Sequence, residues 1–240
     1  MRIFEEFDEL NAFCTDAKDG NFADYTGDDA AVLCARREAL AREIGAKIVL
    51  LKQVHGDDVI EIKSSSIYAS SSSFWFGGEG DGMVSNEKGV VLAIQSADCA
   101  GVTLYDTKNR AVAALHAGRK GAALNILSKC VGKMQKLYGS RPENIKMYIG
   151  THIRGCCYEL PHEMAAEFEE YENAVTIKDG KSYLDIGTVI LAQAKNVGIE
   201  YENIEISLFC SSCESDRFFS HRAHNGKCGR MLTAIGLKAI

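Results

Sequence analysis

The sequence predicts a layered α/β fold, of the α+β kind, whose sheets are mixed rather than purely parallel. Short apolar runs rich in β-branched residues alternate with segments whose apolar residues recur every three or four positions, which is typical of helices packed on sheets. Several strands also follow one another closely between Gly89 and His116. The turn Asp106–Asn109 joins two of them, so at least one pair must form an antiparallel hairpin.

The expected strands are apolar runs that are too short to make a typical helix, and several of them should be buried on both faces. They are Lys47–Val54, Gly89–Gln95, Val102–Tyr105, Ala111–His116, Ile145–Ile149 and Ile204–Phe209. The expected helices are the segments with helical spacing of apolar residues. They are Ala30–Ile44, Ala122–Tyr138, His162–Tyr171 and Thr188–Val197.

We expect a single domain that spans residues 1–240. The chain has only two prolines, and no long Pro-rich, Gly-rich or charged stretch divides it. The nearest thing to a linker is the serine-rich stretch Ser64–Ser73. Its composition predicts a flexible surface loop that leads into a turn at Gly77–Gly82.

The composition narrows the possible functions. Hydrophobic residues make up 46% and charged residues 25% of the chain, as in ordinary globular proteins. The formal charge of −6 supplies no basic face for a nucleic acid, and no apolar run is long enough to cross a membrane. The N-terminus lacks the pattern of a secretory signal, so we expect a cytoplasmic protein whose nine cysteines are reduced thiols.

Three potential metal ligands lie where expected strands end. They are His55, Cys99 and His116, in the segments QVHG, SADC and LHAG. Imidazole and thiolate are ligands that zinc prefers, and a catalytic zinc takes three protein ligands and leaves a fourth position open. Taken alone, each residue is more often an ordinary core residue than a ligand, and no short metal-binding signature joins the three.

Six ordered motifs resemble those of one protein family. The motifs are QVHGDDV (53–59), GDGMVS (80–85), QSADC (95–99), HAGRKG (116–121), GCCYEL (155–160) and FFSHR (218–222), with LDIGT and CGRM in the expected places after residues 183 and 227. They are similar to the laccase-domain family, also called multicopper polyphenol oxidases and, more recently, purine nucleoside phosphorylases. The likeness covers roughly residues 30–240.

This resemblance implies a fold, a metal site and an activity. The implied fold is an α-β-β-α sandwich like the catalytic domain of cytotoxic necrotizing factor, with helices outside two layers of sheet. The implied metal ligands are His55, Cys99 and His116, which hold Zn²⁺. The implied reaction is phosphorolysis of adenosine, inosine and related nucleosides such as methylthioadenosine, with adenosine deamination as a side activity.

The chain departs from the family at places that bear on substrate binding. The family usually reads HAGWRG where this chain has Arg119 and Lys120, and SADC is followed here by Ala-Gly rather than by an apolar residue and Pro. An N-terminal arginine that contacts ligand in the family corresponds to Asp16, and Lys18 could substitute for it. We therefore expect small-molecule partners, a nucleoside and phosphate, while the preferred nucleoside and the oligomeric state stay open.

The remaining site residues are expected to bind phosphate or ribose, or to transfer protons. Arg119 and Lys120 precede a helix, where backbone N–H groups and two cations could hold phosphate. Arg222 is a second candidate for phosphate or ribose, together with Arg230. Asp98, next to the ligand Cys99, is the candidate acid/base for deamination. Cys99 and His116 complete the predicted catalytic set.

A multicopper centre is not expected within one chain. Such a centre needs His-X-His pairs, and no two of the six histidines are separated by one residue. Cu²⁺ could still occupy the predicted zinc site adventitiously, because it outcompetes Zn²⁺ for most nitrogen and sulfur ligands.

Two other readings of the metal residues stay open. Cys99 could be a nucleophile activated by His116 in a cysteine hydrolase or amidase. Alternatively, the chain could be a non-catalytic accessory protein that keeps the metal ligands but has lost substrate contacts.

Two further cysteine motifs are ambiguous. Cys210 and Cys213 form a C-x-x-C, which is half of a structural zinc site or a redox pair, but no second C-x-x-C completes a set of four. The vicinal pair Cys156 and Cys157 either lines the pocket or consists of two small buried apolar residues.

Overall fold

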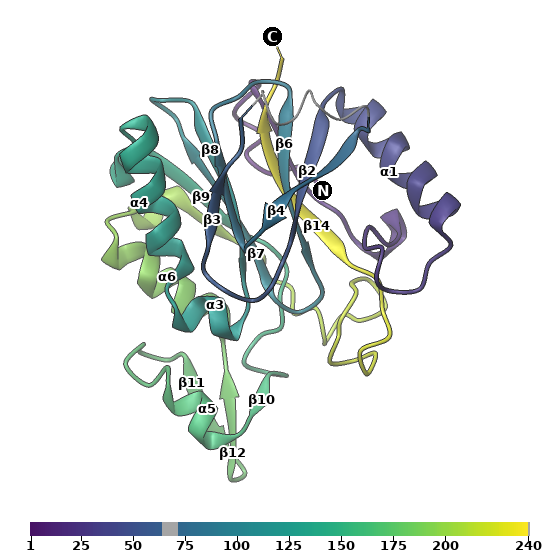
Figure 1. Ribbon diagram of the computed structural model, residues 1–240. Helices are drawn as coiled ribbons and strands as arrows, with labels where there is room; N and C mark the ends of the chain where they lie inside the picture. The colour runs from purple at the N-terminus through teal and green to yellow at the C-terminus, as the bar shows by residue number, and fades with distance from the viewer. Residues whose placement is uncertain (64–71, 240) are drawn as a thin grey trace.

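The computed structural model describes residues 1–63 and 72–239, so most of the predicted Ser64–Ser73 loop lies outside the described residues. Two sheets face each other in the middle of the molecule, with α1 on one side and α4 and α6 on the other (Figure 1). This arrangement confirms the predicted layered fold with mixed sheets.

Within the described residues, the first sheet has five strands and the second has six. The first runs in the order β1 (Leu10–Cys14), β14 (Met231–Leu237), β6 (Val90–Ser96), β2 (Lys47–Lys52) and β4 (Phe74–Glu79). The second runs in the order β13 (Ile204–Ile206), β9 (Ile145–Ile149), β7 (Ala100–Asp106), β8 (Ala111–Ala117), β5 (Gly82–Ser85) and β3 (Val59–Glu61).

A third, small sheet and the helices complete the described elements. The small sheet has the order β10 (Glu159–Leu160), β12 (Lys181–Leu184) and β11 (Val175–Lys178), and lies below the two large sheets (Figure 1). The α-helices are α1 (Ala30–Ile44), α3 (Arg119–Ala123), α4 (Ile126–Tyr138), α5 (His162–Ala166) and α6 (Ile186–Asn196). Short 3-10 turns occupy Ala17–Asp19, Pro142–Asn144 and Tyr201–Asn203. No helix within residues 1–63 and 72–239 combines the length and apolarity needed to cross a membrane.

The hydrophobic core is divided into three layers by the two sheets. Between the sheets, side chains such as Leu92 and Ile94 of the first sheet pack with Tyr105 and Val112 of the second. Because alternate residues of a strand point to opposite faces, the same strands also supply the outer layers. Thus β6 contributes Val91 and Ala93 to the layer under α1, which explains why these strands read as continuous apolar runs.

The predicted hairpin is confirmed as β7 paired antiparallel with β8. Its turn is held by Asp106, which is fully buried and accepts hydrogen bonds from the backbone N–H groups of Lys108 (2.9 Å) and Asn109 (3.1 Å). The amide nitrogen of the Asn109 side chain donates to the other carboxylate oxygen at 2.9 Å. The register starts with Asp106 opposite Ala111 and ends with Ala100 opposite Ala117, which brings His116 to the far end of the hairpin.

Substituting Asp106→Asn is expected to destabilise the protein near pH 7 by about 1.5 to 3 kcal/mol, the usual contribution of hydrogen bonds to a charged group. Burial alone would raise the pKa of Asp106, but hydrogen bonds from neighbouring side chains and from the Lys108 and Asn109 N–H groups lower it. Because the pKa of Asp106 is lower in the folded than in the unfolded protein, ionised Asp106 stabilises the fold at pH values above the unfolded-state pKa of about 3.9. This stabilisation is lost as the pH falls through the folded-state pKa. Urea titrations at pH 7 and pH 3 should therefore show a gap between variant and wild type that narrows at pH 3. An equal gap at both values would contradict this account.

Two helices differ from the prediction. The segment Ala122–Tyr138 is broken into α3 and α4 at Asn125, whose backbone is left-handed (φ 52°) and whose side chain accepts a hydrogen bond from the Ser128 N–H at 3.2 Å. Asparagine favours such caps because its side chain competes for the backbone donors. The helix expected over His162–Tyr171 stops at Ala166.

Several strands of the structure were not predicted, among them β1, β4, β5 and β14. In β14, a Cβ on Gly236 would lie 2.1 Å from the carbonyl oxygen of Val90, so the close approach of β6 requires glycine in a strand interior. Glycine reduces the strand propensity of a segment, so a strand that contains it is harder to predict from sequence. The turn expected at Gly77–Gly82 starts later than predicted, because β4 continues through Gly77 to Glu79.

Candidate functional site

The structure brings the three predicted metal ligands together. His55 follows β2, Cys99 lies between β6 and β7, and His116 is near the end of β8. The potential ligand atoms of all three lie within 4.8 Å of one another, and the two imidazole rings are 4.8 Å apart between centroids. His116 is buried, Cys99 is half-buried and His55 is exposed, so the group opens to solvent on one side.

The histidines favour the thiolate form of Cys99. Burial would raise the pKa of this thiol, but the positive charge of His116 and hydrogen bonds from both imidazoles lower it to about 6. Metals bind the thiolate rather than the thiol. The donor set of two imidazoles and one thiolate therefore fits a divalent cation of the zinc type with a fourth position left for another ligand.

Asp81 is a site residue that the sequence analysis did not identify. Its side chain is fully buried, and one carboxylate oxygen lies 2.8 Å from Nδ1 of His116. The same carboxylate accepts hydrogen bonds from the backbone N–H groups of Val54 (3.1 Å), His55 (3.0 Å) and Gly56 (2.7 Å). Asp81 thus fixes both the His116 ring and the turn that carries His55, as carboxylates behind metal-bound histidines do. The motif GDGMVS contains it, and an acidic side chain within a family motif is the sequence signal that could have revealed it.

Three residues of the site have backbone positions or conformations that few side chains allow. A Cβ on Gly118 would lie 2.7 Å from Sγ of Cys99, so only glycine fits after the His116–Ala117 pair. His55 (φ 60°) and Asp98 (φ 92°) both adopt left-handed backbone conformations. Non-glycine residues rarely do so, and such strain concentrates at functional sites.

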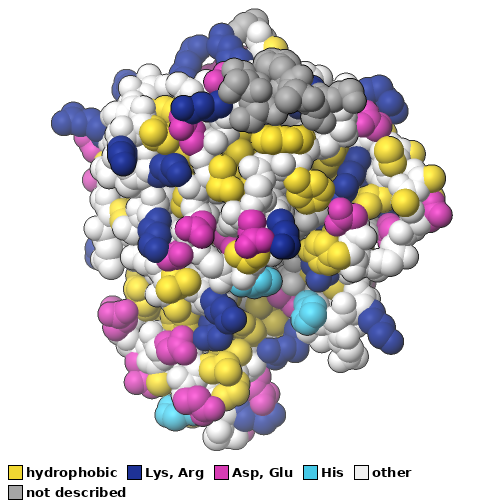
Figure 2. Space-filling model, viewed as in Figure 1, with side chains coloured by type: hydrophobic (Ala, Val, Ile, Leu, Met, Phe, Trp, Pro, Cys, Tyr) yellow, Lys and Arg dark blue, Asp and Glu magenta, His cyan; other side chains and the backbone are white. Residues whose placement is uncertain are grey.

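A cavity of about 440 Å³ opens beside the three ligands, within the range of roughly 300 to 1,000 Å³ that is usual for small-molecule sites. Figure 2 shows histidine side chains at the rim of a hollow in the lower half of the molecule, with Lys and Arg side chains beside it. The small sheet lies on one side of this region and the loop before β14 on the other (Figure 1). Its lining includes two arginines and two tyrosines, which are Arg222, Arg230, Tyr25 and Tyr158.

Each arginine in the lining is stacked on a tyrosine. The Arg222 guanidinium lies 5.4 Å from the Tyr158 ring centroid, and Arg230 lies at the same distance from Tyr25. Backbone carbonyl oxygens of Cys157 (3.2 Å) and Glu159 (3.0 Å) also accept hydrogen bonds from Arg222. These contacts hold the cations in place before any ligand arrives.

Asp98 is the only carboxylate among the described residues that line the cavity. One of its oxygens accepts a hydrogen bond from the Ser211 hydroxyl at 2.7 Å, and the other accepts one from the backbone N–H of Arg222 at 2.7 Å. Asp98 therefore anchors the segment that carries Arg222. Its role as an acid/base stays a prediction.

Arg119 and Lys120 lie at the start of α3 and do not line this cavity. The Arg119 guanidinium is paired with Glu167 at 3.1 Å, and Lys120 is exposed. Asp16 and Lys18 are also outside the lining, and the Asp16 side chain caps a 3-10 turn by accepting from the Lys18 N–H. The phosphate role of Arg119 and Lys120 stays a prediction.

The other histidines are not members of the ligand group. His152 is buried and its Nδ1 lies 2.8 Å from the carbonyl oxygen of Gly150, while His224 Nδ1 lies 2.9 Å from that of Ser220. His221 lines the cavity. Among the described residues, His55 and His116 are the only histidines in a group that could hold a metal ion.

Comparison with known proteins identifies the family. The family model described as multi-copper polyphenol oxidoreductase laccase matches residues 14–238. The chain belongs to this family. A purine nucleoside phosphorylase of Deinococcus radiodurans is 33% identical over 239 residues, covering 95% of this chain and 88% of the relative. A purine nucleoside phosphorylase of Clostridium acetobutylicum is 32% identical over 189 residues, covering 77% of this chain and 75% of the relative.

Solved structures of similar proteins share the fold. YlmD of Geobacillus stearothermophilus superposes with a TM-score of 0.86 at 27% identity, covering 98% of this chain and 94% of that one. The hypothetical protein YfiH of Bacillus licheniformis gives a TM-score of 0.83 at 30% identity, covering 91% and 85%. The likeness to cytotoxic necrotizing factor stays a prediction.

Proposed function

We propose that this chain is a zinc-dependent purine nucleoside phosphorylase that acts on adenosine, inosine and related nucleosides. The observation that carries the proposal is one cavity in which an open His55–Cys99–His116 group, two stacked arginines and two tyrosines meet. Family members about 30% identical that are named purine nucleoside phosphorylase support it.

The metal would be held by His55, Cys99 and His116, with Asp81 orienting the His116 ring. Bound there, zinc would supply an electrophilic centre that stabilises negative charge as the glycosidic bond breaks. With its Nδ1 proton facing the buried Asp81 carboxylate, His116 would offer Nε2 to the metal once the metal replaces any proton there.

Substrate binding would use the walls of the cavity. We assign phosphate to Arg222 with help from Arg230, because both guanidinium groups line the cavity and a planar fork of N–H donors suits phosphate oxygens. Tyr25 and Tyr158 offer aromatic surfaces for a purine ring. Asp98 positions Arg222 through its backbone N–H.

Adenosine deamination would take place in the same cavity as a side activity. It consumes water rather than phosphate and requires a group that moves protons. Asp98 is the carboxylate available in the lining for that task, provided that its hydrogen bonds to Ser211 and Arg222 rearrange.

Incubating the protein with adenosine or inosine, with and without phosphate, tests the proposal. We expect phosphate-dependent release of the free base together with ribose 1-phosphate, seen by chromatography. Phosphate-independent conversion of adenosine to inosine would show deamination as the main reaction. If neither nucleoside is turned over, the phosphorylase proposal is wrong and the accessory-protein reading gains weight.

A second candidate function is a cysteine hydrolase or amidase. Cys99, His116 and Asp81 form a Cys–His–Asp arrangement, in which the acid orients the imidazole and the imidazole stabilises the thiolate. A metal-bound thiolate is a poor nucleophile. The phosphorylase therefore needs the metal on Cys99, whereas the hydrolase needs Cys99 free of metal. Rapid loss of activity on iodoacetamide treatment of metal-free, active protein would favour the hydrolase.

A further inference from the structure

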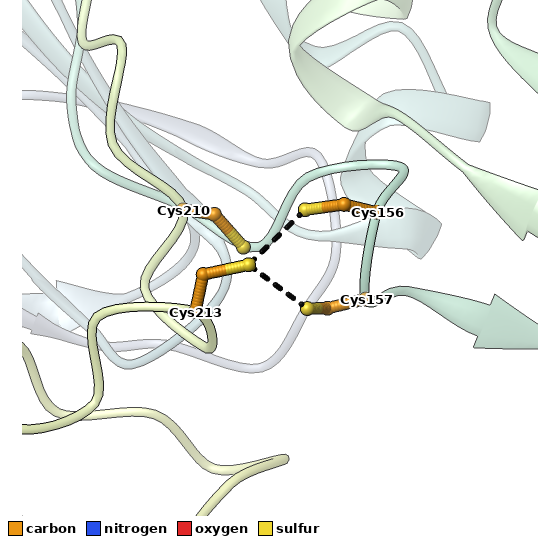
Figure 3. A group of neighbouring side chains, drawn as sticks. All are labelled: Cys156, Cys157, Cys210 and Cys213. Atoms are coloured by element: carbon orange, nitrogen blue, oxygen red, sulfur yellow. Dashed lines mark hydrogen bonds between the residues drawn. The ribbon is translucent and has the colours of Figure 1, made fainter.

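Four cysteines outside the cavity form a second compact group. Cys156 and Cys157 come from the loop after β9, and Cys210 and Cys213 come from the loop after β13 (Figure 3). The Sγ atoms of all four lie within 4.8 Å of one another. No second C-x-x-C exists in the sequence, but the vicinal pair Cys156 and Cys157 supplies the two further thiols that complete a set of four.

The fold itself brings the two loops together. β9 and β13 are parallel neighbours, and a bridge between His152 and Cys210 extends their pairing beyond the strand ends. The backbone N–H of Ser211 donates to the carbonyl oxygen of His152 at 3.0 Å, and the N–H of Arg154 lies 3.4 Å from Sγ of Cys210. The thiols therefore meet because the backbones are paired, independently of any covalent link.

The spacing of the sulfur atoms fits one tetrahedral cation. Four thiolates around zinc at about 2.3 Å stand about 3.8 Å apart from one another. The Sγ atom of Cys213 lies 3.4 Å from that of Cys156 and 3.3 Å from that of Cys157, and no pair exceeds 4.8 Å. A disulfide needs about 2.05 Å between sulfur atoms, and all four thiols are free.

We propose that Cys156, Cys157, Cys210 and Cys213 bind one structural zinc ion in a closed, four-thiolate site, separate from the His55–Cys99–His116 group. Soft thiolates select zinc among the common divalent cations, and four protein ligands leave no position for a substrate. The ion would enter as Zn²⁺ and displace four thiol protons.

Such a site would stabilise the part of the cavity lining that contains Arg222. The carbonyl oxygen of Cys157 accepts a hydrogen bond from Arg222, and Ser211, between the two C-x-x-C cysteines, donates to Asp98, which in turn holds the Arg222 backbone. Both cysteine-bearing loops thus fix the position of Arg222. A metal that ties them together would order this arginine without touching the substrate.

Measuring zinc content in variants of each group distinguishes the four-cysteine site from the His55–Cys99–His116 site. In protein purified without chelator or metal-affinity steps, a thiol-reactive mercurial should release two zinc equivalents per unmutated chain, measured with a chromogenic chelator. His116→Ala should retain one. Adding Cys210→Ser and Cys213→Ser to His116→Ala should remove it, whereas adding Cys34→Ser and Cys228→Ser, which lie outside both groups, should not.

Cobalt reports on the ligands directly. Co²⁺ bound to the His116→Ala chain should show the intense sulfur-to-cobalt charge-transfer absorption of four thiolates, and Co²⁺ bound to Cys210→Ser/Cys213→Ser should show the weaker absorption of a single thiolate. One zinc equivalent in the unmutated chain together with none in His116→Ala would overturn the proposal. Disulfides among the four cysteines in the freshly purified protein would also overturn it. None of these readouts depends on nucleoside turnover, so the phosphorylase proposal can fail while the four-thiolate site stands.

Discussion

The His116→Ala variant is expected to contain one metal equivalent fewer than the wild type and to lose nucleoside phosphorolysis. Removing one of three protein ligands leaves two, and among the described residues no further His or Cys joins this group to replace it. The effect should exceed that of Asp81→Asn, which keeps all three ligands. Loss of such an orienting carboxylate typically weakens metal binding about 10- to 100-fold.

Folding and metal loss can be separated with a second ligand variant. His116 is buried, so His116→Ala also removes packing, but Asp81 keeps its hydrogen bonds from the Val54, His55 and Gly56 N–H groups. His55 is exposed, so His55→Ala should lose the same metal at little cost in stability. His224→Ala serves as the matched control and should keep full metal content. Equal metal in all three variants, measured by elemental analysis, would show that the group is not a metal site.

The Arg222→Ala variant is expected to raise the apparent KM for phosphate by about tenfold or more while leaving metal content unchanged. A charge-assisted hydrogen bond contributes about 1.5 to 3 kcal/mol, and about 1.4 kcal/mol corresponds to a factor of ten. The substitution keeps the backbone N–H that donates to Asp98, so the loop anchor survives. Deamination of adenosine, which needs no phosphate, should change much less.

The double variant Arg119→Ala/Lys120→Ala provides the comparison. Both cations lie outside the cavity lining and Arg119 is already paired with Glu167, so we expect little change in the KM for phosphate. Arg222→Lys should recover only part of the affinity, because an ammonium lacks the planar fork of the guanidinium. If the double variant raised the KM and Arg222→Ala did not, phosphate would bind at the start of α3, as the sequence alone suggested.

Local patterns were sufficient for much of the fold. The β7–β8 hairpin, the helix Ala30–Ile44 and the strand Ile145–Ile149 were predicted because each is specified by residues close in sequence: a turn, a periodic apolar face or a short β-branched run. Elements that depend on distant neighbours were missed. In β14, β6 approaches so closely that Gly236 has no room for a Cβ, and no local signal in the sequence records that approach.

The same division holds for the functional groups. The sequence determined which side chains could carry the chemistry, since His55, Cys99 and His116 each follow or end a recognisable strand and occur in family motifs. Tertiary structure alone decided which residues meet. It placed Asp81 against His116, set Arg222 rather than Arg119 in the cavity wall, and joined two cysteine pairs more than 50 positions apart through the pairing of β9 with β13. Spacing along the chain cannot encode such meetings, because a metal site or a cation site depends on distances of a few ångströms that only the packing of sheets and loops sets.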